Sequence, residues 1–313
     1  MKALDQALDG LRVNGVVQHV ATLRGDWAFE VRPDAAYATL YAMNAGQAWI
    51  MTSQGLPRRL EPGSIALVRP GVPHVVARKR GLATVDARRF FSSCASAKPL
   101  HLRSGHRGTR TEFITGFYYL EHHERDPLLR SLPSLMVLGE SLHPPSVPSG
   151  SWKETLSELD RELRQQAPGF LTVASHLTEI LLIRLIRAWL TTEAAAGGTG
   201  FLAGVAEPSI ARALDALQSD LGGGWSVAKL AQCAGLSRTA FATLFSATMG
   251  EGPASYTRRV RMQKACELLE STQLSTAQVG SFVGYDSEAA FHRVFSHRVG
   301  VTPAQWRRRR RPS

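Results

Sequence analysis

A pattern of two phenylalanines, a glycine and a proline occurs twice in the last third of this chain. The spacing F-x3-F-x4-G-x2-P runs from Phe241 to Pro253 and again from Phe291 to Pro303. The segments just before the two copies, 227–236 and 276–285, also align and carry a glycine at the same place. A repeat this long is improbable by chance, so the C-terminal third is expected to hold two copies of one structural unit.

Each copy is expected to fold as a helix-turn-helix. In the first helix a small residue, Ala231 or Gly280, lets the second helix approach closely, and a following glycine supplies the turn with a positive φ. The paired phenylalanines are four residues apart, so they lie on one face of the second helix and anchor it to the core. The second helix begins after a residue suited to cap it: Ser237 in the first unit, and Asp286 or Ser287 in the second.

The chain between the two copies is expected to form one long helix. The stretch "SYTRRVRMQKACELLE" alternates apolar residues with basic ones at helical spacing. Such a helix would hold the two units at a fixed separation.

Three blocks of the C-terminal third, "WSVAKLAQCAGLSRTAFATLF", "GEGPASYTRRVRM" and "VGYDSEAAFHRVFSHRVGVTPAQWR", resemble the DNA-binding domain of the AraC/XylS family of bacterial transcription regulators. The resemblance covers residues 206–308. It implies a regulator, with activation as the expected effect, whose two recognition helices enter successive major-groove segments of double-stranded DNA about 34 Å apart. RNA polymerase is then an expected further partner.

The face of each second helix opposite its phenylalanines is expected to contact DNA. Arg293 can hold a guanine edge with two hydrogen bonds, and Glu288 can accept from cytosine N4. The first unit offers shorter side chains than is usual in the family, so we expect it to supply phosphate and methyl contacts more than base readout. The expected DNA-contacting residues are Arg238, Thr239, Ala242 and Thr243 in the first unit, Glu288, Ala289, His292 and Arg293 in the second, and Arg258, Arg261 and Lys264 between them.

The charge of the chain agrees with a polyanionic partner. The formal net charge is +11, and residues 205–313 hold 14 Lys and Arg against 8 Asp and Glu. A non-specific architectural DNA binder is an alternative that charge alone leaves open. The three cysteines, Cys94, Cys233 and Cys266, are too few for the four-cysteine zinc site of a methyl-transfer DNA repair protein, and their odd number and wide spacing argue against a disulfide framework.

The N-terminal half has the pattern of a β-protein. Short apolar runs between residues 14 and 120 are separated by turn signals, which predicts an antiparallel barrel or sandwich. The stretch "LEPGSIALVRPGVPHVV" resembles the second motif of the cupin barrel, and "DPLLRSLPSLMVL" with the later "APGF" resembles cupin-type AraC relatives. The resemblance implies a sensor of a small-molecule effector, with His74, Tyr41 and Trp49 as candidate pocket residues.

No metal or other cofactor is expected in this half. Metal sites need three or four preorganised ligands, and the earlier cupin position, "TLYAMNAGQAWIM", has neither His nor Glu to join His74. The chain is therefore not expected to be an enzyme. A cupin metalloenzyme with an accessory DNA-binding domain is the alternative interpretation.

The expected fold is multidomain α+β: an N-terminal cupin-like antiparallel β-barrel with a helical extension, then an all-α tandem helix-turn-helix domain. No run of about 20 apolar residues is long enough to cross a bilayer, and no secretion signal is recognised, so a cytoplasmic protein is expected. The predicted divisions are a sensor barrel at 1–145, a helical region at 146–192, a flexible linker at 193–205, the DNA-binding domain at 206–308 with units at about 227–246 and 276–296, and a basic tail at 309–313. The helical region is expected either to form a dimer contact or to pack only against the barrel.

Overall fold

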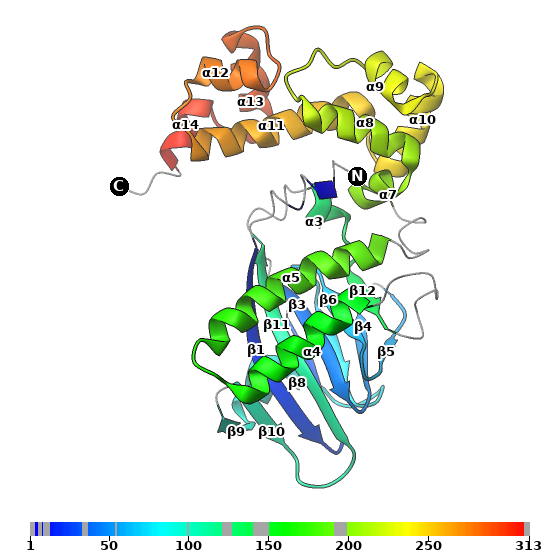
Figure 1. The fold of residues 1–313 in the computed structure, drawn as a ribbon, viewed down its shortest axis with the longest axis vertical. Helices are drawn as coiled ribbons and strands as arrows, with labels where there is room; N and C mark the ends of the chain where they lie inside the picture. Colours follow the sequence, from blue (N-terminus) through cyan, green and yellow to red (C-terminus); the bar gives the residue numbers. More distant parts are fainter. Residues whose placement is uncertain are drawn as a thin grey trace. The chain divides into compact units, whose positions relative to one another are not determined.

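The computed structural model of the 313-residue chain describes residues 4–5, 8, 13–32, 37–53, 55–98, 100–120, 127–139, 150–190 and 199–309. The chain divides into two compact units (Figure 1). The sheet unit comprises residues 11–123 and 132–195, and the helical unit comprises residues 1–10, 124–131 and 196–313.

The sheet unit contains two β-sheets. One has seven strands in the order β12-β6-β3-β11-β1-β10-β9, and the other has five in the order β5-β4-β7-β2-β8. The strands are β1 (Val13–Arg24), β2 (Ala28–Val31), β3 (Tyr37–Ala45), β4 (Ala48–Thr52), β5 (Arg58–Leu60), β6 (Ile65–Val68), β7 (His74–Ala77), β8 (Val85–Asp86), β9 (Ala95–Lys98), β10 (His101–Ser104), β11 (Arg110–Leu120) and β12 (Leu135–Leu138).

The predicted β-rich cupin region is confirmed, but its sheets do not close into a barrel. Among the described residues no strand pairing joins the two sheets. The edge strands of the smaller sheet, β5 and β8, have only three and two residues, which is too short for them to pair also with the edge strands of the larger sheet. Most neighbours are antiparallel as expected, whereas β1 with β10 and β2 with β8 pair in parallel.

One hydrophobic core lies between the two sheets. It takes side chains from the inner face of each sheet, including Leu23, Tyr41 and Phe113 from the larger and Phe29 and Ile50 from the smaller. Because side chains alternate along a strand, every second residue reaches this core. A short helix that the sequence did not predict, α2 (Ala87–Ser92), adds two phenylalanines to the edge of the core.

Two helices cover the outer face of the larger sheet: α4 (Gly150–Gln165) and α5 (Phe170–Leu190) (Figure 1). Helix α5 packs on β1 at Gly15, where a Cβ atom would lie 3.1 Å from the side chain of Thr178. The hydroxyl of Tyr118 on β11 donates to the Thr178 carbonyl at 2.9 Å. The side chain of Arg164 joins α4 to the sheet by pairing with Glu112, a buried carboxylate on β11. None of the described helices is both long enough and apolar enough to span a membrane.

The described secondary structure of the helical unit is α-helical. Its helices are α3 (Pro127–Ser131), α7 (Phe201–Ala206), α8 (Pro208–Ser219), α9 (Val227–Ala234), α10 (Arg238–Met249), α11 (Pro253–Ser271), α12 (Thr276–Phe282), α13 (Glu288–Val299) and α14 (Pro303–Arg309). The long helix expected between the repeats is α11.

The part of the predicted linker at 193–205 that follows Gly200 is a helix, because its apolar side chains are buried. Phe201 and Leu202 in α7 are almost fully inaccessible to solvent. Residue Gly200 before α7 has no side chain to cap it, and Ser131 at the end of α3 takes that role: its Oγ accepts from the Phe201 amide at 2.5 Å. Residues 193–198 lie outside the described part of the chain.

Helix α3 therefore belongs to the helical unit, although the sequence suggested one sensor domain over 1–145. Leu128 and Leu129 of α3 are buried, and α3 packs on α7. Leu4 and Leu8 are also buried and fall in the same unit. Short apolar segments from the N-terminal half thus complete the helical unit.

Candidate nucleic-acid interface

The two helix-turn-helix units, α9–α10 and α12–α13, have the same local construction. Their first helices are capped by Ser226 and Ser275, whose side chains accept from the amides three residues later. The second helices are capped in the same way by Ser237 and Ser287. Of the two residues predicted to cap the second helix of the second unit, Asp286 and Ser287, the cap is therefore Ser287. The second helices are followed by Gly250 and Gly300, both of which have a left-handed backbone. Each helix extends less than one turn beyond its predicted end, at residue 246 in the first unit and residue 296 in the second.

The repeated phenylalanines are the inner anchors of the recognition helices. Phe241 and Phe245 lie in ring contact, as do Phe291 and Phe295, and all four are buried. Each pair is extended by a further aromatic residue: Tyr256 of α11 beside Phe245, and Trp306 of α14 beside Phe295. The orientation of both helices is therefore fixed by aromatic packing on one side.

The turn between helices requires the small and flexible residues that the sequence placed there. Gly235 and Gly284 have φ angles of 72° and 84°. A Cβ atom on Gly280 would lie 3.1 Å from the ring of Phe291, so α12 and α13 are in close contact at this point. The equivalent residue in the first unit, Ala231, is buried.

An arginine from the preceding helix supports each turn. Arg212 of α8 donates to the Ala234 carbonyl at 2.6 Å in the first unit. Arg261 of α11 donates to the carbonyls of Leu221 (3.0 Å), Gly223 (2.6 Å) and Gly284 (3.3 Å). The two arginines are 49 residues apart, the same offset that relates the glycines of the two turns. The repeat thus extends upstream to α8 and α11, beyond the segments in which it was predicted.

These bonds change how Arg261 is interpreted. Arg261 was predicted to contact DNA, whereas its guanidinium group donates to three backbone carbonyls of the protein. A Cβ atom on Gly284 would lie 2.6 Å from the same guanidinium, so glycine is required there for space as well as for φ. The geometry gives Arg261 a positioning role between the 221–223 loop and the second turn.

The outer face of α13 presents the side chains that the sequence selected. Glu288, Ala289 and Arg293 are exposed and His292 is partly buried. Within the described part of the chain, neither Arg293 nor His292 nor Glu288 has a hydrogen-bond or ion-pair partner. Glu288 also stands in the first turn, where a negative charge stabilises the helix dipole, so its presence has a structural explanation as well.

The outer face of α10 is formed by shorter side chains. Arg238, Thr239 and Thr243 are exposed and Ala242 is partly buried. Arg238 is the first residue of the helix, and a positive charge there opposes the helix dipole. Helix stability therefore does not account for Arg238 at this position. One turn beyond the predicted residues, Ser246 and Ser296 occupy equivalent places and extend the two faces.

The basic residues of α11 fall into two groups. Arg259 pairs with Glu251 and lies 4.9 Å from the Tyr256 ring centroid, so it serves the fold. Arg258 is exposed and has no such partner among the described residues, while Lys264 pairs loosely with exposed Glu267 at 3.0 Å. Burial raises the pKa of Tyr285 in the second unit, and the charges of Arg261, Arg258 and Arg298 act against that rise. Three arginines therefore lie near enough to Tyr285 to act on its charge.

Only part of the basic C-terminal tail is described. Arg307 donates to the carbonyls of Leu269 and Leu274, so it holds α14 to the loop before α12. The tail residues 310–313 lie outside the described residues.

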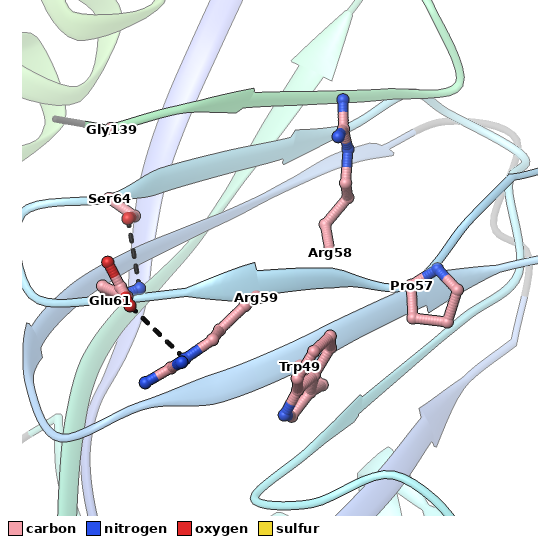
Figure 2. Close-up of a pocket in the computed structure, with 7 residues that line it drawn as sticks. All are labelled: Trp49, Pro57, Arg58, Arg59, Glu61, Ser64 and Gly139. Carbon is pink, nitrogen blue, oxygen red and sulfur yellow. Dashed lines mark hydrogen bonds and ion pairs between the residues drawn. The ribbon is translucent and has the colours of Figure 1, made fainter. Parts of the chain in front are cut away.

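The three candidate effector residues of the sheet unit do not form one site. His74 and Tyr41 are buried between the sheets and form a hydrogen bond with each other, with 2.8 Å between His74 Nε2 and Tyr41 Oη. His74 Nδ1 donates to the Val72 carbonyl at 3.0 Å, which leaves Nε2 to accept from the tyrosine hydroxyl. Burial lowers the pKa of His74 to about 4, so the ring is neutral at pH 7. Trp49 instead lines a separate surface pocket (Figure 2).

The chemistry of the described residues does not include a metal-binding cluster. No group of three or more His, Cys, Asp or Glu side chains in that part of the chain is placed to hold a metal ion. His74 is occupied by Tyr41 and Val72 rather than by a second histidine or a glutamate.

Comparison with known proteins agrees with this geometry. A family model described as "Cupin" matches residues 2–191, and one described as "Helix-turn-helix domain" matches residues 230–309. The HTH-type transcriptional regulator AlkR of Acinetobacter baylyi is 27% identical over 98% of this chain and 99% of its own. The RCS-specific HTH-type transcriptional activator RclR of Escherichia coli is 25% identical over 99% and 98%, and the HTH-type transcriptional regulator MtrA of Neisseria gonorrhoeae is 23% identical over 98% of each chain.

The Cupin match spans more than half of the chain, and the helix-turn-helix match covers the second unit and all of the first from residue 230 onward. Regulators of this type bind double-stranded DNA to control transcription. The chain belongs to the AraC-type transcription regulators that carry an N-terminal cupin domain.

Proposed function

We propose that this regulator reads a specific DNA sequence by placing α10 and α13 in adjacent major-groove segments. The observation that carries the proposal is the outer face of α13: Arg293 is exposed and unpartnered among the described residues, opposite a phenylalanine pair that fixes the helix. A fixed helix with a free guanidinium can hold a guanine edge with two hydrogen bonds.

The two units contribute differently to recognition. The exposed residues of α10 other than Arg238 are short, so α10 supplies methyl and phosphate contacts, with Arg238 on a phosphate. Arg258 and Lys264 add phosphate contacts that do not depend on sequence, and Arg261 acts by holding the second turn. Bound at a promoter in the bacterial cytoplasm, the protein would affect RNA polymerase, with activation as the expected outcome.

Variants of single residues test this division. Arg293→Ala should weaken the binding free energy for the preferred DNA sequence by about 1–3 kcal/mol and relax the preference at one base pair, while its binding to random DNA changes little. Lys264→Ala should weaken binding to both DNAs evenly. Thr243→Ala, the equivalent of Arg293 in the first unit, is the matched control and should leave the preferred sequence as it is. Equal loss on both DNAs for Arg293→Ala would show that Arg293 does not read bases.

The sheet unit is proposed to control the DNA-binding unit without catalysis, by binding an effector and by forming a homodimer. Helix α5 exposes three large apolar side chains, Leu171 (57%), Val173 (43%) and Ile180 (43%), and the last two are seven residues apart on one helical stripe. This stripe supports a contact with the same helix of a second copy. Sedimentation of Ile180→Asp should show a shift toward monomer; an unchanged dimer, or a monomeric wild type, would remove α5 from the proposal.

A further inference from the structure

Helix α3 is a segment of the N-terminal half that packs inside the helical unit. It lies in the chain between β11 and β12, two strands of the larger sheet, yet residues 124–131 belong to the helical unit. Leu128 and Leu129 are buried, and α3 packs against α7. The helical unit therefore includes a helix whose chain continues directly into a strand of the sheet unit.

Ser131, at the end of α3, determines where α7 begins. Its Oγ accepts from the Phe201 amide at 2.5 Å, and a Cβ atom on Gly200 would lie 2.8 Å from the same oxygen. Gly200 also has a φ angle of 113°, a conformation that residues with a side chain rarely adopt. Glycine is thus favoured at residue 200 both for space and for backbone conformation.

Helix α7 in turn contacts the C-terminal end of the recognition helix α10. The Gly200 amide donates to the Thr248 carbonyl at 2.8 Å. Thr248 lies in the last turn of α10, where carbonyls lack amide partners within their own helix. Met249 is buried, and its sulfur leaves no room for a Cβ atom on Gly204 of α7. Helix α3 therefore supports the start of α7, and the start of α7 supports the end of α10.

The recognition helix of the second unit ends against different partners. Arg298, near the end of α13, donates to Ser255 Oγ of α11 at 3.4 Å. Phe295 of α13 lies in ring contact with Trp306 of α14. These partners belong to the last third of the chain, so the support of α13 does not pass through α3.

The chain has no spare residues between Ser131 and the sheet unit. The next residue, Leu132, already belongs to that unit. Arg69, which follows β6, donates from its side chain to the Leu132 carbonyl at 3.2 Å and from its backbone amide to the Ser134 carbonyl at 3.1 Å. Two consecutive residues are thus bonded in different units, and consecutive Cα atoms keep a fixed distance. A displacement of one must pass to the other.

We infer that α3 is the element through which the sheet unit acts on the first recognition helix, with Ser131 and Gly200 as positioning residues for α10. A displacement of β12 moves Ser131, which shifts the start of α7 and changes the support of the last turn of α10. The inference rests on the proposed function for its meaning in DNA reading, because it names the route by which the sheet unit controls the DNA-binding helices.

A purely structural role for α3 is the alternative explanation. In that case the leucines of α3 only cover the apolar side of α7. Changes at Arg69 would then stay within the sheet unit, and loss of the Ser131 hydroxyl would weaken all DNA contacts alike.

Amide hydrogen exchange of the full chain without DNA tests whether α7 responds to the sheet unit. Ser131→Ala removes the acceptor outright and should raise exchange at the Phe201 amide about fivefold, the effect of a lost helix cap. Arg69→Gln changes only the sheet unit, yet it should raise exchange at the same amide by at least about twofold.

Arg164→Gln is the matched control for Arg69→Gln. It also removes an arginine of the sheet unit, but the partners of Arg164 are Glu112 and Asp160. Exchange should rise within the sheet unit and stay unchanged at Phe201. If Arg69→Gln also leaves Phe201 unchanged, the inference is overturned.

Hydroxyl-radical footprinting on the preferred DNA sequence tests the positioning of α10. Ser131→Ala should weaken protection of the block contacted by α10 about three- to fivefold relative to the block contacted by α13, which is the block where Arg293→Ala acts. Ser219→Ala is the matched control, since Ser219 donates within its own helix to the Asp215 carbonyl, and it should protect both blocks like wild type. Equal weakening of both blocks by Ser131→Ala would establish the purely structural role.

The two assays separate this inference from the proposed function. A wild type without any sequence-specific footprint would contradict the proposed DNA reading, and the exchange at Phe201 would still decide whether the sheet unit acts on α7. Urea unfolding of each variant is measured alongside, because general unfolding weakens both blocks together.

Discussion

Replacing Arg261 by Ala is expected to destabilise the helical unit rather than simply remove a DNA contact. The guanidinium donates to the carbonyls of Leu221, Gly223 and Gly284, which ties the loop after α8 to the turn of the second helix-turn-helix. No other described side chain is recorded as donating to these three carbonyls. The variant leaves the carbonyls of Leu221 and Gly284 to water and frees the turn, while the Gly223 carbonyl keeps its hydrogen bond from the Trp225 amide at 2.6 Å.

The size of the effect follows from these three bonds. A hydrogen bond from a charged donor contributes about 1.5–3 kcal/mol net. Arg261 and the residues it binds are only partly buried, so water replaces part of this contribution. We therefore expect a loss of about 2–4 kcal/mol in the free energy of unfolding of the helical unit. Arg258→Ala, three residues earlier on the same helix and exposed, should change stability by less than about 0.5 kcal/mol.

Two assays together decide the role of Arg261. Urea unfolding gives the stability, and amide hydrogen exchange at residues 220–224 reports whether the loop opens. In DNA titrations Arg258→Ala should reduce the slope of log affinity against log salt by about one, as expected for one lost phosphate contact. If Arg261→Ala keeps wild-type stability and exchange but shows that same change of slope, then Arg261 contacts phosphate and the positioning role is wrong.

Two further predictions concern single buried interactions. Ser131→Ala removes the cap of α7 and should lower the stability of the helical unit by about 1 kcal/mol; unchanged urea unfolding would show that the cap is not needed. His74 has its pKa lowered by burial to about 4 against 6.5 in the unfolded chain, so the unfolded state takes up the proton first and stability falls as pH drops below 6.5. Between pH 7 and 5 the wild type should lose about 2 kcal/mol more than His74→Gln, and equal losses in the two proteins would refute the neutral buried ring.

The helix-turn-helix units could be predicted from the sequence because their determinants are local and occur twice. The Phe241 and Phe291 spacings, the turn glycines and the serine caps all act within one or two turns of helix, and their duplication separates them from chance. Which residues lie on the outer faces follows from the phenylalanines by helical geometry alone.

The interactions that were missed join residues far apart in the chain. Ser131 caps a helix 70 residues away, and no local pattern marks it. The roles of Arg212 and Arg261 depend on which way the preceding helix faces its turn, and the predicted repeat began only at residue 227. A cupin-like barrel was predicted, and strand patterns do not show where the pairing between strands stops, so the open edges of the two sheets were not predicted. Tyr41 and Trp49 were grouped although the pairing register places Tyr41 in the core and Trp49 on the opposite face of its sheet.

The most direct test of the account is selection of DNA sequences bound by the full chain from a random pool. Two recognition helices on one face of the duplex predict two preferred blocks whose centres are one helical turn apart, about 10–10.5 base pairs, with the stronger preference in one block. Arg293→Ala should erase preference at one position of the stronger block and leave the weaker block unchanged. A pool without enriched sequence, or a single block unaffected by Arg293→Ala, would contradict sequence reading by this pair of helices.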